Sequence, residues 1–168
     1  MTTARESLAI WLRDAHAMET QAESLLEAQI DRLENYPEAL PRLRSHLEET
    51  RQHKALVEEC LTSLGEDASV FKDTAMKASA NIQGMFHAMA GDEILKNALA
   101  NAAFEQFEAA SYRILVTAAE KAGEVKIART CELIMEQEIS MADWAWGQLQ
   151  PLTEKYLSLE AVGGQAKR

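Results

Sequence analysis

The sequence predicts an all-α fold, a four-helix bundle with one long crossover segment between its second and third helices. Ala, Leu, Glu, Met, Gln and Lys dominate the composition, and 168 residues include only seven Gly and three Pro, a bias that favours helix over strand. In four long segments apolar residues recur at steps of three and four, as on one face of a helix. No segment alternates Val, Ile, Thr and aromatic residues as a strand does.

The first two helices are separated by a proline-containing turn. The first is expected over residues 3–35 and ends there because the residue before Pro37 resists helical geometry. The second is expected to begin near Pro37 or Pro41, both tolerable in a first turn, and to end at Leu64. Gly65 then supplies a favourable cap.

A different kind of segment, residues 66–91, holds weak helical stretches and is long enough to cross the bundle. A third helix is expected over residues 92–123, with acidic residues at its start and Gly123 at its end. The fourth is expected over residues 124–150, stopping before Pro151, and a short further helix is expected over 153–159.

The chain is long enough for one domain with a substantial core, which we place at residues 1–160 with a flexible tail at 161–168. A formal net charge of −10, with no clustered Lys or Arg, argues against nucleic acid as a partner. The N-terminal stretch does not resemble a secretory signal, and no segment approaches the length of a membrane span. Cys60 and Cys131 lack metal-type spacing and are predicted to be core thiols. We therefore expect a cytoplasmic protein.

Four glutamates recur at one interval on the apolar stripes of the four helices. Glu19 and Glu49 are 30 residues apart, as are Glu108 and Glu138, and the second pair repeats the first after 89 residues. A single such Glu is usually a boundary residue that reaches solvent. Four on four helices would meet inside the bundle, where a carboxylate is costly unless a positive charge lies beside it. The pattern favours a pair of metal ions, because bundles of this kind bind two metals between facing helices.

Two further residues extend this constellation. His46 lies one turn before Glu49 and Glu105 one turn before Glu108, so each can reach the same site. Carboxylates suit hard metals, and two neighbouring cations need bridging anions. The predicted metal ligands are Glu19, His46, Glu49, Glu105, Glu108 and Glu138. We expect two metal ions per chain, with iron preferred and manganese or zinc as alternatives.

Three other side chains are ranked below these six. His16 and His53 are each an additional ligand, a partner of a ligand, or a hydrogen-bonded interior histidine. Tyr112, one turn after Glu108, either bonds a ligand carboxylate or acts as an electron donor, but the favoured interpretation is an amphipathic core residue.

At these residues the chain resembles the YciE/YciF-type family of the ferritin-like superfamily. The resemblance is carried by H-x-E-E-T at 46–50 and E-x-x-E-x-x-x-Y at 105–112, together with the segments 14–19 and 136–144. It implies a bacterial, stress-associated protein with a rubrerythrin-like dinuclear centre, often dimeric, and it places the family's ligands on the same six residues. The chain departs from the family at Gln106, where a histidine is common. This difference is expected to affect residues that support the metal ligands more than metal binding itself.

Two classes of function remain open on the sequence alone. The first is a non-haem di-iron or di-manganese protein that reacts with oxygen or peroxide, as a peroxidase or a ferroxidase. No C-x-x-C electron-transfer module is present, so this function would use an external electron donor. The second is a helical stress scaffold or partner-binding protein whose metal is structural or absent. We expect a homodimer in either case, and the sequence assigns no catalytic residue and no substrate.

Overall fold

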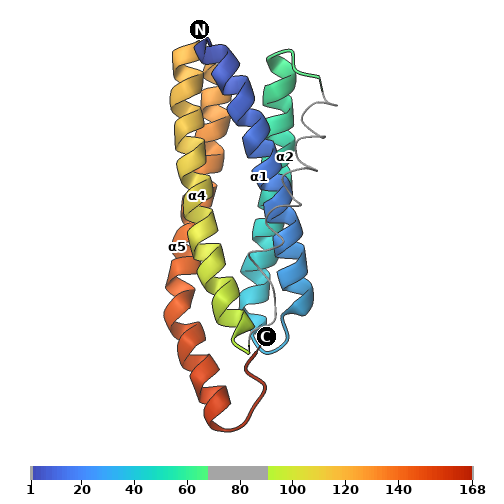
Figure 1. Ribbon diagram of the computed structural model, residues 1–168, viewed down its shortest axis with the longest axis vertical. Coiled ribbons are helices and arrows are strands. Elements are labelled where there is room, and N and C mark those ends of the chain that lie inside the picture. The colour runs from blue at the N-terminus through green and yellow to red at the C-terminus, as the bar shows by residue number, and fades with distance from the viewer. Residues whose placement is uncertain (1, 68–90, 168) are drawn as a thin grey trace.

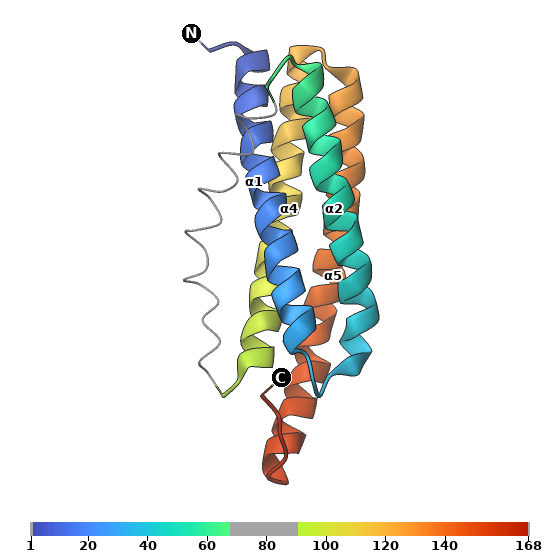
Figure 2. The same ribbon diagram turned by 90° about the vertical axis from the view of Figure 1, so that its right-hand side faces the viewer.

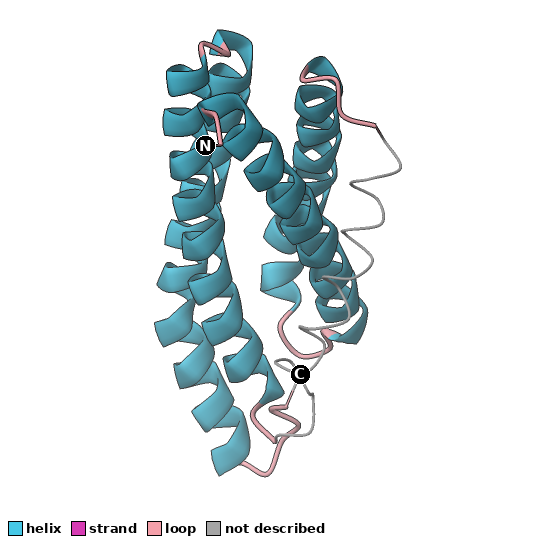
Figure 3. Ribbon diagram, turned by 45° about the horizontal axis from the view of Figure 1, so that its top comes forward, coloured by secondary structure: helices cyan, strands magenta, loops and turns pink. Residues whose placement is uncertain are grey.

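The protein is an all-α bundle, as predicted. The computed structural model describes residues 2–67 and 91–167, and all regular elements within these ranges are helices (Figures 1 and 3). They comprise four long α-helices and one short 3₁₀ helix: α1 Ala4–Arg32, η1 Pro37–Ala39, α2 Leu40–Ser63, α4 Glu93–Ala122 and α5 Val125–Ala161.

The helices form two antiparallel hairpins, α1–α2 and α4–α5, which pack together along the bundle (Figures 1 and 2). Helices α2 and α4 run in the same direction, as expected of a bundle in which a crossover joins the second helix to the third. The predicted crossover 66–91 lies outside the described residues, apart from its first two positions and its last.

Capping residues mark the helix ends in the sequence. At the start of α1, the Thr3 hydroxyl accepts a hydrogen bond from the Glu6 N–H at 3.2 Å, and the Glu6 carboxylate accepts one from the Thr3 N–H at 2.7 Å. At the end of α4, Gly123 adopts a left-handed conformation with φ of 76°, as expected of a C-cap glycine.

The prediction that the fourth helix ends at Gln150 is wrong, because α5 continues through Pro151 to Ala161. Proline inside a helix removes one backbone hydrogen bond and costs about 3 kcal/mol. The turns beyond Pro151 bury Leu152 and Tyr156 in an apolar cluster at this end of the bundle. This packing offsets the local cost, and one continuous helix replaces the two expected.

The residues that follow α5 return to the bundle. The Tyr36 hydroxyl donates a hydrogen bond to the Ala166 carbonyl oxygen at 2.7 Å, and the Ile94 N–H donates one to the Lys167 carbonyl oxygen at 2.9 Å. Of the stretch 161–168, Ala166 and Lys167 therefore lie against the turn between α1 and α2 and the start of α4. The flexibility expected of this tail stays a prediction.

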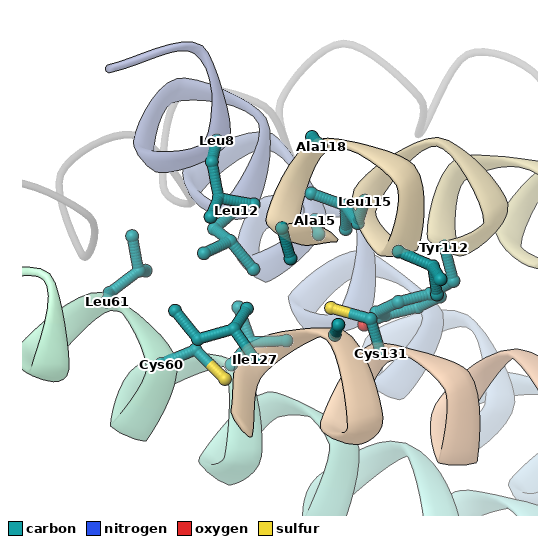
Figure 4. Packing of buried hydrophobic residues seen from close by; sticks show 14 of the residues in the cluster. Leu8, Leu12, Ala15, Cys60, Leu61, Tyr112, Leu115, Ala118, Ile127 and Cys131 are labelled. Carbon is teal, nitrogen blue, oxygen red and sulfur yellow. The ribbon is translucent and has the colours of Figure 1, made fainter. Parts of the chain in front are cut away.

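The core changes in composition along the length of the bundle. The end where α1 begins is filled by aliphatic side chains together with Cys60 and Cys131, both buried as predicted (Figure 4). The end where α4 begins holds two smaller apolar clusters. Between these regions lies a layer of buried acidic residues and histidines. Among the described helices, none is long and apolar enough to cross a membrane.

Candidate metal centre

A layer of ionisable side chains crosses the middle of the bundle. Four helices contribute to it, and each residue is at most 3% exposed. Its members are Glu19 from α1, His46 and His53 from α2, Glu105 and Glu108 from α4, and Glu138 from α5. The apolar periodicity of each helix turns these positions inward, so the layer follows from the same pattern that builds the core.

These residues form two groups with the spacing of metal ligands. In the first group, one ligand atom each from His46, Glu105, Glu108 and Glu138 lie within 4.8 Å of one another. The His46 Nε2 atom is 3.0 Å from a Glu105 oxygen and 3.7 Å from a Glu138 oxygen. Three carboxylates and one imidazole therefore converge on a single point.

The second group shares one member with the first. It consists of Glu19, His53 and Glu138, again within 4.8 Å of one another. The His53 Nδ1 atom is 2.7 Å from one Glu138 oxygen and 3.6 Å from a Glu19 oxygen. Glu138 therefore stands between the two groups, where a carboxylate bridging two cations would stand.

Many of the ligand-type atoms of this layer have no hydrogen-bond partner within the protein. Within the described part of the chain, eight buried oxygen and nitrogen atoms on these six residues have no hydrogen-bond partner, including both oxygens of Glu108 and of Glu138. The His46 Nε2 and His53 Nδ1 atoms lie 3.0 and 2.7 Å from carboxylate oxygens of the layer, but neither contact has hydrogen-bond geometry. Buried polar atoms are normally paired, so this convergence of lone pairs suits cations and the residues fit a metal pair.

The electrostatics of the layer agree with this interpretation. Burial raises the pKa of Glu108 well above its ordinary 4.5, and the like charges of Glu138 and Glu105 add to the effect. Burial also raises the pKa of Glu138 and of Glu19, although His53 opposes it in both. Without a cation, each of these carboxyls holds its proton to a higher pH than a free carboxyl does, and a bound metal would compete with that proton.

Burial has the opposite effect on the pKa of the two histidines, but neighbouring carboxylates outweigh it. Burial lowers the pKa of His46, but contacts with Glu105 and Glu49 outweigh it and raise the pKa to about 9. For His53, contacts with Glu138 and Glu19 likewise outweigh burial and raise the pKa to about 10. In the metal-free protein both rings are therefore cationic at neutral pH and partly neutralise the carboxylates.

Glu49 is the one predicted ligand that the structure does not bring into either group. Its side chain is 24% exposed and accepts hydrogen bonds from Arg42 at 2.9 Å and from the His46 Nδ1 at 3.0 Å. The bond to His46 and the neighbouring Arg42 lower the pKa of Glu49 to about 2. In this position Glu49 orients the His46 ring, and its role as a direct ligand stays a prediction.

The structure brings in two side chains that the sequence analysis ranked lower. His53 belongs to the second group, and its seven-residue interval from His46 was the available signal, since that interval returns to the same helix face. The Tyr112 hydroxyl donates a hydrogen bond to a Glu19 oxygen at 2.5 Å, so this residue contacts the centre as well as the core.

Two other positions lie away from the centre. The His16 Nε2 atom is 2.8 Å from a Glu58 oxygen, and His16 belongs to neither group. Gln106 is exposed on α4, as expected for a side chain that points away from the site.

The metal-free protein is expected to lose stability as the pH rises from about 6 to about 10. The pKa values of His46 and His53 are raised from 6.5 to about 9 and about 10 on folding. Such groups stabilise the fold below their unfolded pKa, and this contribution is lost as the pH rises through the folded values. The raised pKa of Glu108 acts in the same direction, starting above pH 4.5.

Melting temperatures measured across this pH range, with and without metal, test this expectation. Bound metal replaces the protons, so the loss should be smaller in the loaded protein. A melting temperature of the metal-free protein that is constant or rises with pH would contradict the prediction.

Comparisons with known proteins agree with the fold. A family model described as "Domain of unknown function (DUF892)" matches residues 3–158. The chain is also similar to a protein from Xanthomonas campestris pv. campestris whose crystal structure has been solved, with 38% sequence identity and a TM-score of 0.79. The match covers 95% of this chain and 99% of that one.

Proposed function

The protein belongs to the DUF892 family, which is ferritin-like, and we propose that it is a dinuclear non-haem metal protein whose centre reacts with oxygen or peroxide. The observation that carries the proposal is Glu138, whose two buried oxygens have no hydrogen-bond partner and which belongs to both groups of ligand-type atoms. One carboxylate shared by two groups is the arrangement that a pair of cations requires.

Each of the two groups of ligand-type residues would hold one cation. His46, Glu105 and Glu108 would hold one ion, Glu19 and His53 would hold the other, and Glu138, which belongs to both groups, would contribute to both. Iron is the preferred metal, with manganese and zinc as alternatives, because carboxylates and imidazole accept all three.

A pair of reduced iron or manganese ions would supply the electrons for reduction of oxygen or peroxide. The chain's own residues would hold this centre in place and keep it dry. Tyr112 fixes one oxygen of Glu19 by its hydrogen bond, and Glu49 fixes the ring of His46. Burial of the whole layer strengthens each electrostatic contact and excludes water.

The first test is metal stoichiometry. Protein loaded anaerobically with Fe(II) or Mn(II) and freed of excess metal is expected to hold about two ions per chain, as two-metal sites do, measured by elemental mass spectrometry. Replacement of His53 by alanine is expected to remove the ion held by the second group. The matched control is His16→Ala, another buried histidine, which should leave the stoichiometry unchanged.

Wild-type protein that folds normally but binds no metal would contradict the proposal and support the alternative of a helical scaffold. Assignment to the YciE/YciF-type branch, a role in stress response, a homodimer, an external electron donor and a cytoplasmic location all stay part of the proposal. The resemblance supports the first three of these, and the absence of C-x-x-C from the sequence supports the external donor.

A further inference from the structure

An open cleft runs along the surface between α1 and α4. Two adjoining cavities form it, an inner one of about 430 Å³ and an outer one of about 440 Å³, and Trp11 and Ile114 line both. The lining extends over residues 4–18 of α1, which is roughly 21 Å of helix, and over residues 107–121 of α4. The cleft therefore follows the seam between the two helices for about half the length of each.

The inner end of the cleft lies at the level of the acidic layer. Met18 and Phe107 line this end. In the sequence they directly precede Glu19 and Glu108, two members of the layer. Because α1 and α4 are antiparallel, the outer end lies where α1 begins and α4 ends, beside Lys121. The two ends of the cleft therefore have different surroundings.

Apolar side chains form much of the walls of the cleft. Trp11, Phe107 and Ile114 are 42%, 60% and 55% exposed, which is high for large apolar residues. Ala15 and Leu115 also line the inner cavity and are buried. Exposed apolar surface that is hollowed rather than flat is typical of a small-molecule site, and each cavity has a volume in the range of such sites.

Charged residues are distributed unevenly along the cleft. Asp14 is the one acid among the described residues that line it, and it belongs to the inner cavity. Arg113 and Lys121 line the outer cavity and, within the described part of the chain, form no ion pair. Two unpaired cations beside an apolar surface are complementary to an anion with an apolar body. Since Asp14 repels an anion from the inner cavity, the charged group of such a ligand would lie at the outer end.

We propose that this cleft binds one long-chain fatty acid, with its alkyl chain in the inner cavity and its carboxylate beside Arg113 and Lys121. An alkyl chain has no hydrogen bonds to lose, so walls such as Trp11 and Ile114 accept it without leaving polar groups unpaired. Burial of each methylene strengthens binding, which selects long chains over short ones. The site uses none of the six residues of the acidic layer, so the proposal does not depend on metal in the centre.

An affinity that rises with the chain length of the fatty acid is the first expected result. The metal-free protein is titrated with octanoate, decanoate and dodecanoate below their micelle concentrations, and calorimetry should show a single site on each chain. Each added methylene should strengthen binding about fourfold while the cleft still has room for it. Dodecanoate that does not bind saturably, or that binds in many copies without dependence on chain length, would overturn the proposal.

Replacing Ile114 by glutamate tests the position of the alkyl chain. Ile114 lines both cavities and is largely exposed, so Ile114→Glu places a carboxylate in the cleft at little cost to folding. The affinity for decanoate is expected to fall about tenfold or more, because the ligand loses apolar contact and meets a like charge. The matched control is Leu99→Glu, which changes a 62% exposed leucine on the same helix outside both cavities. Equal losses of affinity in the two variants would place the ligand elsewhere and overturn the proposal.

Neutral substitutions of the two cations test the position of the carboxylate. Arg113→Gln with Lys121→Gln is expected to lower the affinity for decanoate about fivefold at low ionic strength, because two attractive contacts are lost. Lys126→Gln with Arg129→Gln removes the same net charge from exposed positions on α5 and should have little effect. Similar affinities in the two double variants would overturn the placement of the carboxylate.

Trp11 gives a direct signal from the cleft. Trp144→Phe with Trp146→Phe leaves it as the only tryptophan, and decanoate should shift its emission to shorter wavelength as water leaves the cleft. Unchanged emission at saturating decanoate would place the ligand elsewhere and overturn the proposal. Light scattering tests for another occupant: a dimer that Ile114→Glu dissociates, without fatty-acid binding, would show that a second copy of the chain covers the cleft. None of these results depends on metal stoichiometry, so this proposal and the proposed function can fail separately.

Discussion

Replacing Glu138 by alanine is expected to abolish metal binding at both positions of the centre. Glu138 contributes oxygens to both groups, and both oxygens are buried without a hydrogen-bond partner. Removal of a residue that only orients a ligand typically costs 10–100-fold in affinity, so loss of a shared ligand should cost at least about 100-fold at each position. Titration with Mn(II) or Fe(II), followed by calorimetry, measures both affinities.

Two comparisons make this experiment specific. Glu136→Ala removes an exposed carboxylate two residues away on α5 and should leave both affinities unchanged. Glu49→Ala should weaken binding by about 10–100-fold without changing the stoichiometry if Glu49 acts through His46. Retention of two tightly bound ions by Glu138→Ala would show that the acidic layer is not the metal centre.

Replacing Glu108 by leucine is expected to stabilise the metal-free protein while removing metal binding at the first group. Both Glu108 oxygens are buried without a partner, and Glu138 and Glu105 lie close enough to raise its pKa further. Replacing buried ionic groups by apolar residues of similar volume is often stabilising, by about 1–4 kcal/mol. A gain of this size should raise the melting temperature of the metal-free chain by several degrees, at about 2–4 °C per kcal/mol.

The comparison variant is Glu120→Leu, which changes an exposed glutamate on the same helix. It should alter neither metal binding nor stability by more than about 0.5 kcal/mol. A metal-free Glu108→Leu protein that melts below the wild type would mean that Glu108 is satisfied in the fold, contrary to the structure. The expected trade of stability for binding is typical of functional sites.

The sequence predicted the helices and most of the acidic layer because both depend on one periodicity. Glu19, Glu105, Glu108 and Glu138 fall on apolar stripes, and a residue on such a stripe faces the interior whatever its side chain. Their burial therefore followed from spacing alone. The continuation of α5 could not be predicted in this way, because it depends on packing between residues distant in sequence.

On α2, residue spacing was too coarse to distinguish ligands in the centre from a residue at its edge. At 100° per residue, seven residues return within about 20° of the starting direction, whereas three residues stop about 60° short of a full turn. His53 therefore points with His46 into the centre, and Glu49 lies at its edge, where Arg42 competes for its carboxylate. The hydrogen bond from Tyr112 to Glu19 joins different helices, so it depended on a packing register that no single helix encodes.

Alkylation of the two cysteines in the close-packed end of the bundle can be used to detect unfolding. Burial raises the pKa of Cys60 to about 11 and that of Cys131 to about 12. Since the thiolate is the nucleophile, neither sulfur reacts readily at neutral pH while the core is closed. Alkylating reagents should label both positions only in molecules that have opened, so the extent of labelling counts open molecules directly.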